Sequence, residues 1–167
     1  MKALTRIIFS LGIVIFCLFL SLSVLETVET TAKTALDQKN INVHIEKLTE
    51  NGPRSIIDKD ANSKAIEYIA SELEKYGAQK GDLTDSFAYL IQDYVAEDTK
   101  GLYQNFYLQN VIAYIPASSE APSGRAALFM AHVDSVPTSF GAADDGIACA
   151  VMLEAIRYYS EQIENGA

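Results

Sequence analysis

The sequence is poor in several residue types, and each shortage narrows what the protein can be. Among 167 residues there are two cysteines, two histidines and no tryptophan. Cys17 lies in an apolar run and Cys149 in a predicted helix, so both are interpreted as small hydrophobic residues and not as a disulfide framework. Lysine and arginine number 13 against 22 acidic residues, which gives a net charge of −9. Without a basic stripe to neutralise phosphates, the chain is not expected to bind nucleic acid.

Charged residues are also absent from residues 7–25, IIFSLGIVIFCLFLSLSVL, and this absence indicates a membrane segment. Nineteen helical residues rise about 28 Å, enough to cross the hydrocarbon core of a bilayer. Lys2 and Arg6 precede the run and Glu26 and Glu29 follow it, which favours a cytoplasmic N-terminus. We predict a single-pass membrane protein whose remainder lies on the non-cytoplasmic side.

The chain is expected to divide into a cytoplasmic N-terminus (residues 1–6), a transmembrane signal anchor (7–25), a polar stalk (26–41) and a folded domain (42–167). A cleaved signal peptide is the alternative for the apolar run. Such a peptide has an apolar region of about 7–15 residues and a small-residue cleavage site. The run is longer than that, and only Ser21 and Ser23 are small residues near its end.

Two helices are predicted at the start of the folded domain from the spacing of apolar residues. NVHIEKLTENG gives a short helix, and its His44 is expected to be a partly exposed surface residue, not a metal ligand. DANSKAIEYIASELEKYG gives a longer helix, capped by Asp60 or Asn62 at its start and followed by Gly77. Its charged residues are interpreted as a solvated face, opposite an apolar face of Ile66, Ile69, Ala70, Leu73 and Tyr76.

Strand patterns follow. Residues 86–98 and 103–117 are rich in aromatic and β-branched residues and are divided by TKG, which predicts an antiparallel hairpin. RAALFMA, residues 125–131, predicts a third strand buried on both faces. GIACAVMLEAIRYYSEQI, residues 146–163, predicts a final helix on which Glu154 is a solvated residue. The order of elements indicates an α/β fold, with a mixed β-sheet flanked by helices.

A histidine and three aspartates gather in AHVDSVPTSFGAADDG, residues 131–146. His132 and Asp134 project to one side of an extended chain, and Asp144 stands at the start of the final helix, from where it could reach the same metal. Asp145 could cap that helix. The pattern fits either a metal site or a helix cap beside a surface histidine. For a metal, histidine and carboxylate ligands favour zinc over manganese or cobalt.

The segment NVIAYIPA…GRAALFMAHVDSVPTSFGAADDGIACAVMLEAIRYY resembles the first half of the catalytic domain of family-28 zinc metallopeptidases. Upstream, VHIEKLTENGPRSIIDKDANSKAIEYIASELEKYG resembles the opening helices of that family and the Pro-Arg segment between them. The family includes secreted aminopeptidases and membrane-anchored peptidases of the endoplasmic reticulum and vacuole. The resemblance runs from about residue 42 to residue 159, and the pattern H-x-D…G-A-x-D-D-G is its most specific part.

The resemblance implies a role for each residue of the motif. His132 would ligate one zinc ion, Asp144 would bridge two, and Asp134 would be a catalytic residue as the acidic side chain that supports the histidine from behind. Asp145 would follow Asp144 through a cis peptide bond. The implied reaction is hydrolysis of the N-terminal peptide bond of a peptide substrate. Two zinc ions about 3.5–4 Å apart would polarise the carbonyl and activate a shared water.

The family pattern also contains a Glu-Glu pair downstream, for a general base and a ligand, which this sequence lacks. After Gly146 the only glutamates are Glu154, Glu161 and Glu164, and no histidine follows His132. We therefore expect a partial catalytic domain that is inactive by itself. The function predicted is a membrane-anchored zinc aminopeptidase, and the alternatives are a non-catalytic domain of the same fold or a glutaminyl cyclase-like enzyme.

Overall fold

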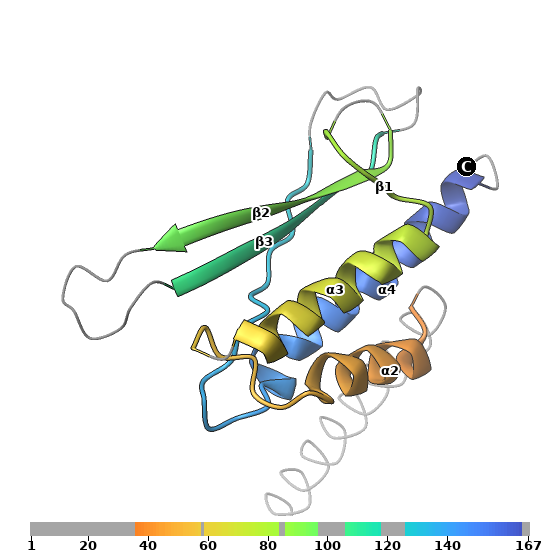
Figure 1. Ribbon diagram of the computed structural model, residues 1–167. Coiled ribbons are helices and arrows are strands. Elements are labelled where there is room, and N and C mark those ends of the chain that lie inside the picture. The colour runs from red at the N-terminus through yellow and green to blue at the C-terminus, as the bar shows by residue number, and fades with distance from the viewer. Residues whose placement is uncertain (1–35, 58, 84–85, 97–105, 118–125, 165–167) are drawn as a thin grey trace, which may run out of the picture. The chain divides into compact units, whose positions relative to one another are not determined.

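The computed structural model describes residues 36–57, 59–83, 86–96, 106–117 and 126–164. Its elements belong to one compact unit that begins at Gln38. In chain order they are α2 (Gln38–Thr49), α3 (Lys59–Lys75), β1 (Gln79–Lys80), β2 (Ala88–Ala96), β3 (Phe106–Tyr114), the kinked turn η1 (Ala142–Gly146) and α4 (Ile147–Glu164). Figure 1 labels α2, α3, α4, β1, β2 and β3.

The sheet is mixed and has the order β1-β2-β3. β2 and β3 form the predicted antiparallel hairpin, in a register that places Tyr89 opposite Ala113 and Ile91 opposite Val111. β1 was not predicted; it is only two residues long and pairs in parallel with the start of β2. The prediction of an α/β fold with a mixed sheet is thus confirmed for the part of the chain that is described.

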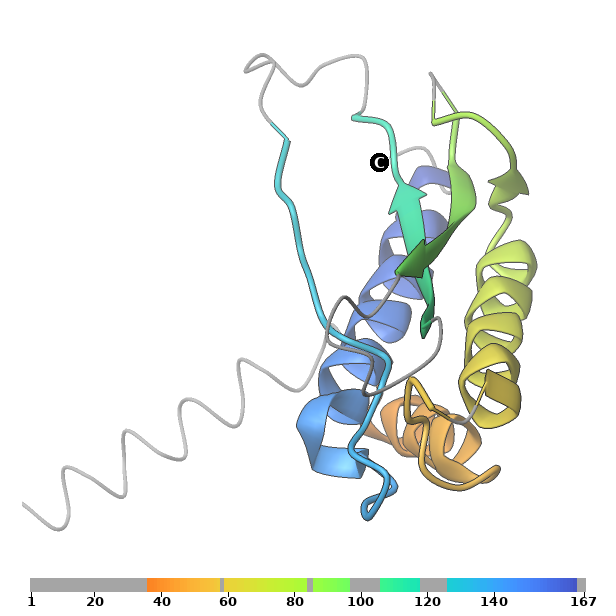
Figure 2. The same cartoon turned by 60° about the vertical axis from the view of Figure 1, so that its left-hand side comes forward.

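The helices pack together beside this sheet. α3 contacts β3, while α4 contacts α2 and α3, and the two views in Figures 1 and 2 show α3 and α4 side by side. The buried core between them is formed by Leu48, Ala65, Ile69, Ala70, Leu73, Ala78, Tyr89, Cys149 and Leu153. Most of the apolar face predicted for the second helix is therefore buried, as expected from its helical spacing.

The helix ends agree with the sequence in part. α2 begins at Gln38, four residues before the predicted start at residue 42, and α3 ends just before Gly77, whose φ of 94° suits glycine as predicted. Asn62 does not cap α3, because its side-chain amide donates instead to the Arg54 carbonyl. The solvated face predicted for α3 is wrong at Glu72, which is buried and bonded to Lys75 and Tyr76.

The third predicted strand is not formed. Residues 126–131 are extended, but they pair with no strand among the described residues. Leu128, Phe129 and Met130 are 72–81% exposed, whereas burial on both faces was predicted. A strand assignment requires a neighbour that supplies the ladder of hydrogen bonds, and the described sheet does not extend beyond β3 to provide one.

The transmembrane anchor predicted at residues 7–25 lies outside the described residues. Within the ranges that the structure describes, no helix is long and apolar enough to cross a membrane.

Candidate metal centre

The predicted site residues lie on the loop that joins the extended segment to α4. His132 follows that segment directly, and its main-chain oxygen accepts a weak hydrogen bond from the Cys149 thiol of α4, with 3.4 Å between Sγ and O. Cys149 is buried, and burial raises the pKa of its thiol to about 11. It is thus the small, inert packing residue that was predicted for this helix.

The two nitrogens of the His132 ring contact oxygens of different aspartates. Nε2 lies 3.1 Å from Oδ1 of Asp144, twelve residues further along the chain. Nδ1 lies 2.9 Å from the main-chain oxygen of Asp134 and 3.5 Å from its carboxylate. These contacts, led by the hydrogen bond to the Asp134 carbonyl, raise the pKa of His132. The fold therefore brings together all three residues of the predicted site.

The pair formed by His132 and Asp144 has a spacing that suits a shared metal ion. Ligand distances of about 2.0–2.2 Å with tetrahedral geometry place neighbouring ligand atoms about 3.3–3.6 Å apart. The observed separation of 3.1 Å is close to this value. Both side chains are open to solvent, and that of Asp144 is 89% exposed. Among the described residues, however, no group of three or more His, Cys, Asp and Glu side chains could hold a metal.

The start of α4 has an unusual main chain. The peptide bond between Asp144 and Asp145 is cis, as the family resemblance implied. Both residues have non-helical torsion angles, which put the kink inside η1. The predicted cap by Asp145 is not seen, since its carboxylate makes no hydrogen bond to a helix amide in the described part of the chain. Asp145 instead contributes its main-chain oxygen, which accepts the Ile147 amide.

Sequence reasoning missed a buried residue beneath this loop. Arg54, in the link between α2 and α3, is 1% exposed. Its guanidinium donates to the carbonyls of Val133, Phe140 and Gly141 in the loop and to that of Leu48 in α2. The family resemblance included the Pro-Arg segment, but no local pattern indicated these contacts, because an arginine between Pro53 and Ser55 is normally expected on the surface.

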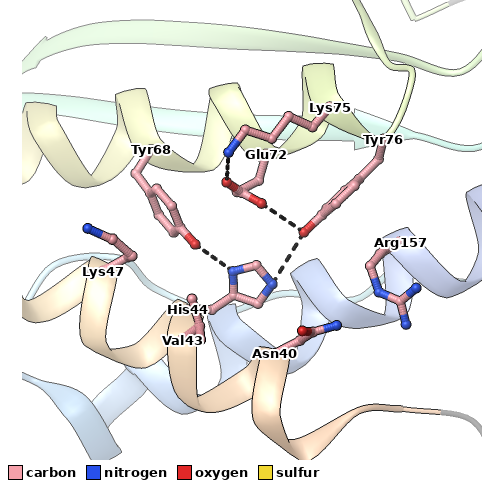
Figure 3. Close-up of a pocket in the computed structure, with 9 residues that line it drawn as sticks. All are labelled: Asn40, Val43, His44, Lys47, Tyr68, Glu72, Lys75, Tyr76 and Arg157. Carbon is pink, nitrogen blue, oxygen red and sulfur yellow. Dashed lines mark hydrogen bonds and ion pairs between the residues drawn. The ribbon is translucent and has the colours of Figure 1, made fainter.

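The second histidine lies elsewhere, and the prediction that it is partly exposed is wrong. His44 is 4% exposed and lines a cavity of about 370 Å³ between α2, α3 and the later part of α4 (Figure 3). Its Nδ1 lies 2.7 Å from the Tyr68 hydroxyl and its Nε2 lies 3.3 Å from the Tyr76 hydroxyl. The prediction that it is no metal ligand stays untested, but both ring nitrogens already have partners.

The protonation state of His44 follows from its partners. Tyr76 donates its hydroxyl proton to Glu72, with 3.0 Å between the oxygens, so Tyr76 can only accept from Nε2–H of His44. Burial favours a neutral ring, in which Nδ1 accepts from the Tyr68 hydroxyl. Burial lowers the pKa of His44, and Glu72 opposes that shift only in part. Figure 3 shows this chain of contacts from Tyr68 to Glu72.

The charges around this cavity are paired with one another. Lys47 binds Glu50, and Lys75 binds Glu72. The Arg157 guanidinium binds Glu154, which is fully buried and also accepts a hydrogen bond from Asn40. Glu154 was predicted to be solvated, and that prediction is wrong because Arg157 neutralises it inside the helix packing. The charged side chains that line the cavity therefore already have hydrogen-bonding and ionic partners.

Known proteins resemble the chain at this loop and beyond it. The sequence profile of Peptidase family M28 matches residues 110–166, which include His132, Asp134 and Asp144. Endoplasmic reticulum metallopeptidase 1 of Mus musculus is 30% identical over 133 residues, which cover 77% of this chain and 14% of that protein.

Two fungal proteins are also similar to this chain over a small part of their own length. A putative endoplasmic reticulum metallopeptidase 1 of Schizosaccharomyces pombe is 46% identical over 57 residues, 34% of this chain and 7% of that protein. The vacuolar membrane protease of Candida albicans is 28% identical over 149 residues, 83% of this chain and 17% of that protein. The chain thus spans less than a fifth of the length of these curated relatives.

Proposed function

This chain belongs to peptidase family M28, and from that premise we propose that it serves a membrane-anchored, zinc-dependent aminopeptidase that hydrolyses N-terminal peptide bonds. The matched relatives are named for metallopeptidase or protease activity, and several are named for the endoplasmic reticulum or the vacuolar membrane. We propose the same kind of location, with the domain on the non-cytoplasmic side and residues 7–25 as the anchor.

The observation that carries the proposal is the approach of His132 Nε2 to within 3.1 Å of the Asp144 carboxylate. Both groups are exposed, and both are ligands that zinc accepts. In the structure the two side chains form an ion pair across twelve residues of chain. A cation bound by both Nε2 and the carboxylate would account for their close approach.

The residues of the loop would act in distinct ways. His132 would offer the lone pair of Nε2, while its Nδ1–H donates to the Asp134 main-chain oxygen and fixes the ring orientation. Asp134 would add a negative charge behind the ring, which makes the imidazole a better ligand. Asp144 has two carboxylate oxygens, enough to bridge two ions. When bound, zinc would supply the polarisation of the scissile carbonyl and a water of lowered pKa.

The test compares Asp144→Asn with Asp93→Asn in the full-length protein. Asp93 is an exposed carboxylate on β2 that pairs with Gln109, away from the loop. We expect Asp144→Asn to lower both the zinc content and the hydrolysis of aminoacyl substrates, by at least about 100-fold for activity. Asp93→Asn should match the wild type in both measurements.

Equal zinc content in the wild type and Asp144→Asn would contradict the assignment of Asp144 as a ligand. A wild-type protein that binds zinc at this loop but hydrolyses no aminoacyl substrate would instead support the non-catalytic alternative. Cyclisation of an N-terminal glutamine, without peptide hydrolysis, would identify the glutaminyl cyclase-like alternative.

A further inference from the structure

We propose that Arg54 is a positioning residue for the metal centre, which holds the loop between His132 and Asp144 at both of its ends. The inference rests on the proposed function, because it takes these two side chains to be metal ligands. Arg54 lies far from the loop in the sequence. Figure 2 shows the link between α2 and α3 beside the loop that leads into α4.

The guanidinium reaches both ends of the loop at once. Its Nε donates to the Val133 carbonyl over 2.7 Å, at the residue between His132 and Asp134. Its Nη1 and Nη2 donate to the carbonyls of Phe140 and Gly141 over 2.6 and 3.0 Å, shortly before Asp144. A single rigid plane therefore holds the main chain beside His132 and, at the other end, three to four residues before Asp144.

The main chain of Arg54 ties the same loop to the scaffold. Its amide donates to the Ser135 hydroxyl over 2.9 Å, and the Ser135 amide donates to its carbonyl over 3.1 Å. That carbonyl also accepts a hydrogen bond from Asn62 of α3, and Nη1 donates to Leu48 of α2. The loop is thus held through Arg54 to both helices.

Gly141 connects this arrangement to the start of α4. Its carbonyl accepts from Arg54 Nη2 and also from the amide of Gly146, over 3.0 Å in each case. Its φ is 64°, and an added Cβ would lie 2.5 Å from the Cβ of Ser135 and 3.0 Å from Arg54 Nη2. The approach of the guanidinium to the turn that carries Asp144 therefore depends on the absence of a side chain at residue 141.

The chemistry of the contacts requires arginine. Every hydrogen bond of the buried guanidinium in the described part of the chain goes to a main-chain carbonyl, four bonds in all. An ammonium group has three donors at one point and could not span Val133 and Gly141 in a plane. A buried cation without a carboxylate partner is tolerated only when its donors are used. Burial lowers the pKa of Arg54, and nearby groups, Asp134 of the loop among them, oppose that shift only in part.

The test measures loop order and metal affinity separately in the full-length protein. Arg54→Met removes the donors, and Arg54→Lys keeps the charge but not the planar fork. Leu73→Ala is the matched control, since Leu73 is equally buried in α3 but donates nothing to the loop. Amide hydrogen exchange of the metal-free protein reports on the loop at Ser135 and Gly146, and on α3 at Ala78, whose amide binds the Leu73 carbonyl.

In the metal-free protein, we expect Arg54→Met to accelerate exchange at Ser135 and Gly146 by at least about 10-fold relative to Ala78, and Leu73→Ala to do the reverse. Zinc affinity, measured by competition with a chelator, should fall by about 10–100-fold in Arg54→Met and in Arg54→Lys, as for other groups that orient a ligand. It should stay within about twofold of the wild type in Leu73→Ala.

Uniform acceleration of all three amides, or an unchanged zinc affinity in both Arg54 variants, would overturn the proposal and leave Arg54 with a general role in stability. If Arg54→Met does not fold, Arg54→Lys and Ser135→Ala carry the same test. A wild-type protein that binds no zinc would refute the proposed function instead. The exchange of Ser135 and Gly146 would then still decide whether Arg54 orders the loop.

Discussion

The two histidines of this chain stand in opposite surroundings. His44 is enclosed by α2, α3 and α4, with both ring nitrogens bonded to tyrosine hydroxyls. The side chain of His132 is 50% exposed, with both ring nitrogens facing aspartate oxygens. The pKa of His44 is lowered by burial, whereas that of His132 is raised, chiefly by its hydrogen bond to the Asp134 carbonyl.

The difference shows how a fold separates a structural histidine from a candidate ligand. The partners of His44 supply one donor and one acceptor, so its neutral ring is complete and has no free lone pair. The partners of His132 are acceptors only, and they can neutralise a cation that binds at Nε2. The sequence reveals the second environment because its members are close in the chain. The first environment requires the packing of α2 on α3.

The largest effect on zinc affinity should appear when the removal of His132 is compared with the removal of His44. His132→Ala should lower zinc affinity by at least about 100-fold, since it deletes a proposed ligand. His44→Ala should leave zinc affinity unchanged but destabilise the fold by about 1–3 kcal/mol, because buried tyrosine hydroxyls lose their partners. Chelator competition and urea unfolding of both variants measure the two effects. Loss of zinc in His44→Ala at full stability would break the comparison.

A smaller difference in zinc affinity should distinguish substitution of Asp134, beside His132, from substitution of Glu72, near His44. Asp134→Asn should weaken zinc binding by about 10–100-fold, since Asp134 orients His132 and supplies charge. Glu72→Gln removes the charge behind Tyr76 and His44, and it should lower only the melting temperature. Calorimetry and zinc titration of the two variants distinguish these outcomes. An equal zinc affinity for Asp134→Asn and the wild type would leave Asp134 with no part in the metal centre.

The smallest effect concerns pH. The pKa of His44 in the folded protein lies below its ordinary value of 6.5, so the unfolded chain binds more protons just below pH 6.5. The stability that neutral His44 contributes is therefore present above pH 6.5 and is lost as the pH falls through the lower, folded value. His44 faces the acidic Glu72 and Glu154 and the basic Lys75 and Arg157.

Urea unfolding between pH 7 and pH 5 should show a steeper loss of stability in the wild type than in His44→Gln. All other titrating groups, His132 included, are present in both proteins and largely cancel in the difference. Parallel curves would mean that the buried ring titrates as it does in the unfolded chain.

The predictions that succeeded depend on neighbours in sequence. The apolar spacing of Ile66, Ile69 and Leu73 predicts α3, and the aromatic and β-branched runs predict β2 and β3. The approach of His132 to Asp134 needs only an extended chain. Asp144 is twelve residues away, and the motif of the family placed it near His132 in advance.

The predictions that failed concern burial, which depends on partners distant in the chain. Glu72 and Glu154 have the spacing of solvated helix residues, and the cations three residues later, Lys75 and Arg157, fit a solvated face equally well. Their burial comes from helix packing, as when Asn40 of α2 bonds Glu154 across 114 residues. The tyrosine that bonds Nδ1 of His44 is 24 residues away. Arg54 binds carbonyls 79–87 residues away. No local pattern contains such information, because tertiary packing creates it.

The same dependence explains residues 126–131. Their apolar sequence predicts a strand buried on both faces, and that prediction is wrong, because a strand also needs a paired neighbour. The segment pairs with no strand of the described sheet, and its Leu128, Phe129 and Met130 are exposed.

The crowded turn at Gly141 has a consequence for inherited variation. Every missense change at a glycine codon adds at least a Cβ atom, and here that atom would meet Ser135 at 2.5 Å. The positive φ of this residue would in addition strain any residue that has a side chain. Even the mildest replacement, alanine, therefore collides with the turn. In a survey of natural alleles or a saturation library, nearly every substitution of Gly141 should abolish any activity of this loop, although Gly141 is neither a ligand nor charged.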